Sequence, residues 1–84
     1  MNETKKKLET ISKSNKEMEF GIIVVEAVDE GDNAYEDIAS YIISTFLSCT
    51  TEEEFKLADR MLTAVTGYGI NTLLSRMEGG AANE

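Results

Sequence analysis

Carboxylates are concentrated in one short stretch of the sequence, EAVDEGDNAYED at residues 26–37, where six of twelve side chains are acidic and none is basic. Such a cluster could bind calcium, supply a general acid and base, or attract a basic molecule. An EF-hand calcium loop needs Gly at its sixth position and Glu at its twelfth. A loop that begins at Asp29 has Ala34 and Ser40 there, and a loop that begins at Glu30 has a tyrosine at both positions. The sequence therefore predicts no calcium site in this stretch.

The residue types of the chain give little support for other catalytic chemistry. Acid–base catalysis needs carboxylates held in a cleft, but these acids fall in expected loops and first helical turns, where carboxylates are solvated. The chain has no histidine, which is the usual acid or base near neutral pH and the commonest metal ligand. Its single cysteine, Cys49, follows an apolar helix face, which is typical of a buried structural thiol. The sequence therefore predicts a protein that is not an enzyme and uses no cofactor or metal.

Charge is distributed unevenly along the chain, whose formal net charge is −8. Residues 1–16 carry five lysines and two glutamates, residues 17–55 carry eleven acids and neither Lys nor Arg, and residues 56–84 are balanced. A long run of one sign repels nucleic acid and attracts basic surfaces. The simpler explanation is that the acidity serves only solubility.

The expected location is the cytoplasm. A lone cysteine cannot form an internal disulfide, which favours a reducing, intracellular setting. The basic N-terminus leads into LETISKSNKEME rather than into the apolar stretch of a signal peptide. The longest apolar run without glycine is IIVV, far shorter than the roughly 20 residues that span a bilayer. We therefore expect no contact with a membrane.

Apolar residues at helical spacing predict a long N-terminal helix from about Asn2 or Glu3 to about residue 30. They are Leu8, Ile11, Met18, Ile22 and Val25, with Asn15 at the skipped position of the heptad. A polar residue at such a position can fix the register of paired helices, so a homodimer and a monomer are equally compatible with the pattern. The alternative is a break near Gly21 and a strand over residues 20–28, because four β-branched residues in a row favour extended structure. A lone strand would have no partner in this chain, which favours the helix.

Turn-forming and capping residues predict where a second helix begins. Gly31 is expected to end the first helix in the left-handed conformation, and Asp32 or Asn33 to cap the next. Asn33 followed by Glu36 resembles a capping box. The second helix then runs to about Ser48.

A third and a fourth helix follow from clearer signals. Thr51 and Glu54 form a capping box, and the third helix runs from there until Gly67 ends it. Its apolar face is expected to comprise Phe55, Ala58, Leu62 and Val65. A short fourth helix spans about residues 69–78, and residues 79–84 form a flexible tail. The predicted fold is an all-α bundle of three to four helices, a single domain over residues 1–78.

Part of the C-terminal half, LTAVTGYGINTLLSRMEGG at residues 62–80, suggests a different function. Its relevant residues are Leu62, Ala64, Gly67, Thr72, Ser75, Arg76 and Glu78. In this pattern the segment resembles the helix-turn-helix of phage-repressor-type regulators, although it needs one extra residue after Gly67 and shifts Ala64 out of register. The resemblance implies a DNA-binding regulator. The would-be recognition helix offers only Arg76 as a base, whereas DNA binding needs several phosphate contacts, so a glycine-ended corner between two helices is preferred.

The sequence thus predicts a non-enzymatic, acidic protein-binding module. Its partner is expected to be a basic protein, in the first place one that binds nucleic acid. In size and charge the chain is similar to anti-CRISPR and anti-restriction inhibitors of phages and mobile elements, which present carboxylates where phosphates would lie. The expected partner-binding residues are Glu26, Asp29, Glu30, Asp32, Glu36, Asp37, Glu52, Glu53 and Glu54.

Two alternatives remain open from the sequence. The first is a small self-associating structural or regulatory protein, in which the apolar faces of the first two helices form a dimer interface and Asn15 sets the register. The second is a degenerate helix-turn-helix regulator. The net charge of −8 argues against direct binding of nucleic acid by the favoured module.

Overall fold

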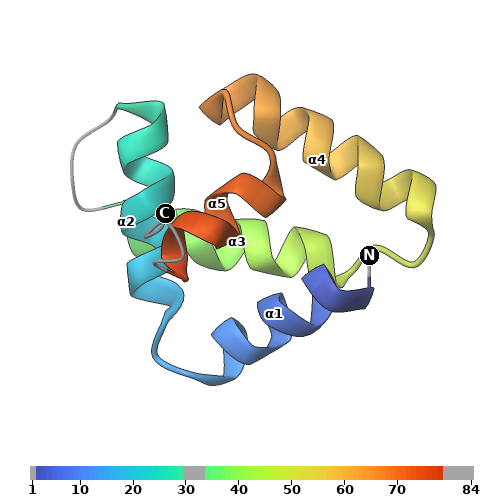
Figure 1. Ribbon diagram of the computed structural model, residues 1–84, viewed down its shortest axis with the longest axis horizontal. Coiled ribbons are helices and arrows are strands. Elements are labelled where there is room, and N and C mark those ends of the chain that lie inside the picture. The colour runs from blue at the N-terminus through green and yellow to red at the C-terminus, as the bar shows by residue number, and fades with distance from the viewer. Residues whose placement is uncertain (1, 30–33, 79–84) are drawn as a thin grey trace.

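The computed structural model of the protein describes residues 2–29 and 34–78, which contain five α-helices (Figure 1). In chain order they are α1 (Asn2–Lys13), α2 (Glu17–Val28), α3 (Tyr35–Leu47), α4 (Glu52–Thr66) and α5 (Ile70–Met77). The described part of the chain contains no strand, so the all-α prediction is confirmed. Residues 20–28 belong to α2, and the alternative of a strand there is wrong.

The prediction of one long N-terminal helix is wrong, because the chain turns at residues 14–16 between α1 and α2. The Ser14 N–H donates to the Thr10 carbonyl at 3.0 Å and completes the last turn of α1. A straight helix over residues 2–28 would be about 40 Å long, whereas the longest extent of the described molecule is 32 Å. The turn lets Leu8 of α1 and Phe20 of α2 enter the same core. Asn15 is exposed in this turn and has no heptad position in a continuous helix.

Helix α3 lies at the centre of the fold and contacts α1, α2 and α4 (Figure 1). The largest fully buried side chains come from α1, α2, α3 and α5. They are Phe20, Phe46, Leu8, Ile43, Ile70, Leu73 and Val24. Helix α4 adds Phe55, Ala58 and Leu62 to this core, each slightly accessible to solvent. The core is therefore most completely closed on the side of α3 away from α4.

Helices α2 and α3 approach each other closely at Gly21 and Tyr35. Gly21 is buried, and a Cβ atom added to it would lie 2.7 Å from the Tyr35 carbonyl carbon and closer still to the carbonyl oxygen. Backbone atoms cannot shift away as the end of a flexible side chain can. Glycine at position 21 is therefore what permits the two backbones to come this close.

The end of α2 differs from the sequence prediction. Asp29 is the C-cap and adopts the left-handed conformation with φ 57° and ψ 41°. Aspartate visits this region more readily than most residues with a side chain. The predicted stop at Gly31, and the predicted caps Asp32 and Asn33, lie outside the described residues. Helix α3 begins after Ala34, which makes no side-chain capping bond.

The predicted ends of α4 are confirmed. Thr51 Oγ1 accepts a hydrogen bond from the Glu54 N–H at 3.1 Å, and Gly67 ends the helix with φ 84°. Helix α5 follows after a short link, so the predicted glycine-ended corner is also confirmed. Asp59 of α4 caps α5 from outside, because its Oδ1 accepts from the Ile70 N–H at 2.8 Å. The predicted tail, residues 79–84, lies outside the described part of the chain.

Two hydrogen bonds, together with the ion pair of Lys7 and Glu78, attach α1 to the remainder of the fold. Thr4 Oγ1 donates to Asn71 Oδ1 of α5 at 2.9 Å. Lys5 Nζ donates to the Cys49 carbonyl at 2.9 Å, just beyond the C-terminal end of α3. A cation at this end of a helix also interacts favourably with the helix dipole. These contacts fix α1 across α3 and α5.

Candidate functional site

The predicted partner-binding residues lie in two groups near opposite ends of α3. Of the nine, Glu30 and Asp32 lie outside the described residues, and the other seven are all exposed. The first group, here the α2–α3 acidic group, comprises Glu26, Asp29, Glu36 and Asp37, and the second, the α4 acidic group, comprises Glu52, Glu53 and Glu54. The 13 residues of α3 separate the groups by about 20 Å. The structure therefore brings the acids together in two places rather than in one continuous patch.

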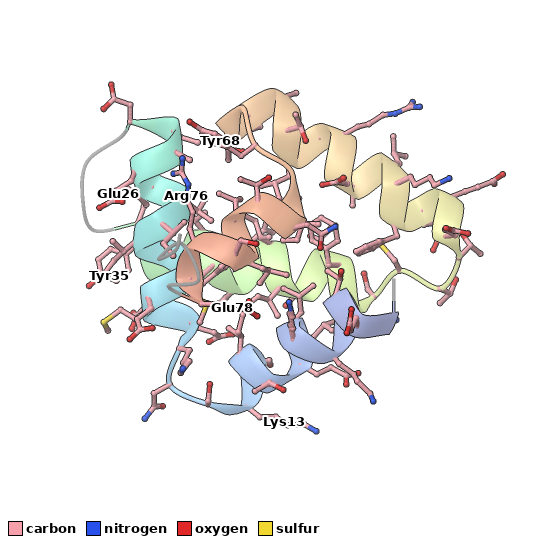
Figure 2. The ribbon with its side chains drawn as sticks, in the orientation of Figure 1. Lys13, Glu26, Tyr35, Tyr68, Arg76 and Glu78 are labelled. Atoms are coloured by element: carbon pink, nitrogen blue, oxygen red, sulfur yellow. The ribbon has the colours of Figure 1, made fainter. Side chains whose placement is uncertain are left out.

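The α2–α3 acidic group begins where α2 ends and α3 starts. The Glu26 side chain points outward from α2 (Figure 2). Glu36 and Asp37 occupy the first turn of α3, where carboxylates interact favourably with the positive end of the helix dipole. In residues 2–29 and 34–78 the only ion pair joins Lys7 and Glu78, at 3.0 Å. None of the carboxylates of this group is thus neutralised by a cation of the described chain.

Within the α4 acidic group, Glu54 has a structural role. Its carboxylate accepts hydrogen bonds from the Thr50 N–H at 2.8 Å and from the Thr50 hydroxyl at 3.2 Å. These bonds, the backbone one above all, hold the pKa of Glu54 below its ordinary value. Glu52 and Glu53 are exposed beside it and make no ion pair within the described chain. They are the members of this group that remain available to a partner.

An apolar groove between α3 and α4 was not foreseen from the sequence. It has a volume of about 410 Å³ and is closed at one end by Val24 and Val28 of α2. From α3 it is lined by Asp37, Ile38, Tyr41, Ile42, Thr45 and Phe46, and from α4 by Ala58, Met61, Leu62, Val65 and Thr66. Two other hollows are lined mostly by polar and charged residue types. Of the three, this groove has the most apolar lining, which makes it a candidate for binding an apolar surface.

Helices α3 and α4 carry more apolar residues than are buried in the core, and some of the remaining ones line the groove. Tyr41 is 72% exposed, Met61 58% and Val65 69%. Val65 thus belongs to the predicted apolar face of its helix, but it is not covered by another helix. Val65 lies three positions after the buried Leu62, so it belongs to the same apolar arc. The sequence shows that this arc of α4 is apolar, but it does not show which residues of the arc another helix covers.

The charges near the groove are of one sign. Asp37 is its only charged lining residue, and no lysine or arginine contributes to it. The two cations of α4, Lys56 and Arg60, lie outside the lining. Helix α1, which carries four of the lysines, crosses the opposite side of α3 from α4 in the view of Figure 1. Most of the lysines therefore lie on the α1 side of the molecule, and the groove lining is apolar with one acidic residue.

Helix α5, the would-be recognition helix, offers little to DNA. Ile70, Leu73 and Leu74 are buried in the core. The only basic residue of α5 is Arg76, whose guanidinium lies 4.3 Å from the centre of the Tyr68 ring (Figure 2). One cation already stacked on an aromatic ring is far from the several phosphate contacts that DNA binding requires.

The remaining chemical groups make no further site. Cys49 is buried, and its thiol donates to the Thr45 carbonyl at 3.3 Å, as expected for a structural cysteine. Across residues 2–29 and 34–78, no three His, Cys, Asp or Glu side chains gather closely enough to hold a metal ion. None of the described helices has the length and apolar character needed to cross a bilayer.

No family model matches the chain, and no curated protein or solved structure matches it either. Function therefore has to be inferred from the chemistry of the surface. That surface combines exposed carboxylates without intramolecular ion pairs and an apolar groove with an acidic end.

Proposed function

We propose that the protein is a non-enzymatic binding module for a basic protein. The observation that carries this proposal is the set of exposed carboxylates in residues 17–55, a run without lysine or arginine, none of which pairs with a cation of the described chain. Unpaired carboxylates of one sign attract and orient a positively charged surface. A reducing, cytoplasmic setting is part of the same proposal, because it is the setting that the lone cysteine favours.

A basic protein that handles nucleic acid is the first candidate for the partner. Such proteins hold phosphates in positively charged channels. The two acidic groups lie about 20 Å apart along α3, a distance over which one strand of B-DNA carries about six phosphates. Carboxylates at the two ends of that span would occupy part of such a channel and exclude the nucleic acid. The protein would then act as an inhibitor in the manner of anti-CRISPR or anti-restriction proteins.

The test is a tagged pull-down from host lysate at low and at high salt, with the retained proteins identified by mass spectrometry. We expect a basic, nucleic-acid-binding protein that is retained at low salt and weakened at high salt, because exposed charges are screened. The acid-reversed variant combines Glu36→Lys and Glu53→Lys, one change in each acidic group. Its matched control combines Glu3→Lys and Glu9→Lys, which add the same charge to exposed positions of α1.

The acid-reversed variant is expected to lose the partner, and the control to keep it. Helical circular dichroism of both variants establishes that each is folded. Retention of the partner by the folded acid-reversed variant would contradict the proposal. So would recovery of no basic protein at either salt concentration.

A second candidate function is self-association, which the exposed apolar side chains of α3 and α4 favour. The interface first expected for it comprises the apolar faces of the first two predicted helices. Part of it is used inside the protomer, because Leu8, Ile11 and Val25 are buried, whereas Met18 and Ile22 remain exposed. The face of the second predicted helix lines the groove, so a dimer would use the groove together with these exposed residues. Sedimentation equilibrium distinguishes this candidate, because an apolar dimer persists at high salt.

A further inference from the structure

The groove between α3 and α4 has the dimensions and chemistry of a binding site for one helix. Its long wall is the part of α3 from Asp37 to Phe46, which extends for about 15 Å, or nearly three helical turns. Its other wall is the exposed apolar row of α4, which includes Met61 and Val65 one turn apart. Two helices that diverge above a shared apolar floor leave the space in which a third, amphipathic helix can lie.

The lining contains both a fixed floor and adaptable rims. Phe46 and Leu62 form part of the floor and are buried in the core of the protein. Tyr41 and Met61 stand on the rims and are more than half exposed. Aromatic and methionine side chains are enriched at protein interfaces, because they provide much contact area and, in methionine, an adaptable shape. A ligand helix would cover these rims and exclude water from them.

Charge decides which kind of helix fits. Asp37 lies at the end of the groove near α2, where Asp29 and Glu36 are also exposed. No cation lines the groove to balance them. A helix with a lysine or arginine beside its apolar face at that end would pair with Asp37, whereas an acidic helix would be repelled.

We propose that this groove binds one amphipathic, basic helix of the partner, with apolar side chains toward α3 and α4 and a cation beside Asp37. The inference rests on the proposed function, since it names the element of the basic partner that is bound. A second copy of this chain is the less suitable occupant, because each copy has a net charge of −8 and would bring another Asp37 toward the same face. A nucleic acid is excluded by an apolar and acidic lining.

The direct test measures fluorescence anisotropy with three labelled peptides of about 14 residues. The first has leucines along one helical face and lysines along the other. The second has glutamates in place of the lysines, and the third has the composition of the first with its leucines scattered around the helix. We expect the first peptide to bind at least about tenfold more tightly than either of the others. Equal binding of the first and third peptides would mean attraction to charge alone and would overturn the inference.

Two matched methionine variants locate the binding site. Met61→Glu places a carboxylate on the groove, and Met18→Glu places one at a methionine that is also exposed but lies outside this groove. Both variants change the net charge equally, so a difference between them reports position. We expect Met61→Glu to weaken binding of the first peptide by about tenfold or more and Met18→Glu to leave it within about twofold. Equal effects of the two variants would place the peptide elsewhere.

The Asp37→Asn variant tests whether the carboxylate at the acidic end of the groove contributes to peptide binding. At low salt we expect the first peptide to bind this variant about three- to tenfold more weakly, with the difference shrinking as salt is added. An unchanged affinity and salt dependence would remove Asp37 from the proposed contact. Sedimentation equilibrium completes the test, because a wild-type dimer that Met61→Glu converts to a monomer would assign the groove to a second copy.

The outcomes of this test are separable from those of the proposed function. A recovered basic partner that still binds Met61→Glu but not the acid-reversed variant would leave the proposed function standing and overturn the groove inference. Recovery of no basic partner would overturn the proposed function, even if the peptides bind at the groove.

Discussion

Helix α3 meets α2 in a closed contact and α4 in one that is open along part of its length. On the first side, Gly21 lets the backbones approach, and Phe20 and Val24 are fully buried. On the second side, Tyr41 and Val65 remain exposed above a groove. Both sides are built from apolar residues at helical spacing. The difference shows that apolar periodicity specifies what a helix can cover, whereas the placement of the next helix decides what it does cover.

The largest expected effect is on the closed side. Phe20→Ala removes a ring with no solvent exposure and leaves a cavity in the core. We expect the free energy of unfolding to fall by about 3–5 kcal/mol. Denaturant unfolding followed by circular dichroism measures it. A loss below about 1 kcal/mol would mean that this side is not the closed core described above.

Gly21→Ala is the next test of the closed side. The added methyl group collides with the Tyr35 carbonyl, so α2 and α3 must move apart. We expect a loss of about 2–3 kcal/mol, although alanine favours a helix more than glycine does. The same denaturant titration checks it. Increased stability would show that the two backbones are not in close contact.

One pair of variants makes the same chemical change at a buried and at an exposed valine of the groove lining. Val24 of α2 is 1% exposed, whereas Val65 of α4 is 69% exposed. Val24→Thr buries a hydroxyl and should cost about 1–3 kcal/mol, whereas Val65→Thr should change stability by less than about 0.5 kcal/mol. Thermal unfolding of both variants measures the difference. Similar losses would mean that the groove is closed in solution.

Substitution of the N-cap residue of α4 tests the stability of the helix that forms the open side. Thr51→Ala removes the acceptor for the Glu54 N–H and should cost about 1 kcal/mol. Thr51→Ser keeps the hydroxyl and is the matched control, with an expected change of a few tenths of a kcal/mol. Chemical denaturation of the two variants provides the comparison. Equal stability of both variants would show that this hydrogen bond contributes nothing measurable.

The smallest expected effect is the pH dependence that Glu54 contributes. Hydrogen bonds from Thr50 lower the pKa of its carboxyl in the folded protein, so the carboxylate stabilises the fold above its ordinary pKa of 4.5. That contribution is lost as the pH falls from 4.5 through the lowered value. Glu54→Gln, which has no charge to titrate, should therefore lose less stability on acidification than the wild type. Thermal unfolding from pH 6 to pH 3 measures this, with Glu53→Gln as the control.

The sequence was sufficient for the elements whose ends carry local chemical signals. Thr51 with Glu54 and the left-handed Gly67 define α4, because capping depends on neighbouring residues alone. The turn at residues 14–16 has only a weak signal, since Ser14 and Asn15 favour turns but the heptad spacing from Ile11 to Met18 spans them. The entry of α1 and α2 into one core, a tertiary property, is what accompanies the break.

The candidate site was less predictable than the fold. Acidic residues could be counted, and the seven described candidate residues are exposed. Their division into two groups depends on the direction of α3, which the spacing of charges along the chain does not specify. The groove depends on the separation of α3 and α4, so the apolar face that includes Val65 could be predicted but not its exposure on an open surface.

The hydrogen bond from the Ile70 N–H to Asp59 has a consequence for the mechanics of the groove. Asp59 lies on α4 but outside the lining, and Ile70 begins a helix whose apolar side chains are in the core. Any outward movement of α4 near Met61 must break this bond or displace α5 from the core. This bond therefore ties the α4 wall of the groove to a helix that is packed in the core. A wall held in this way loses less conformational entropy on binding than a free one, which favours a helix that fits the existing spacing.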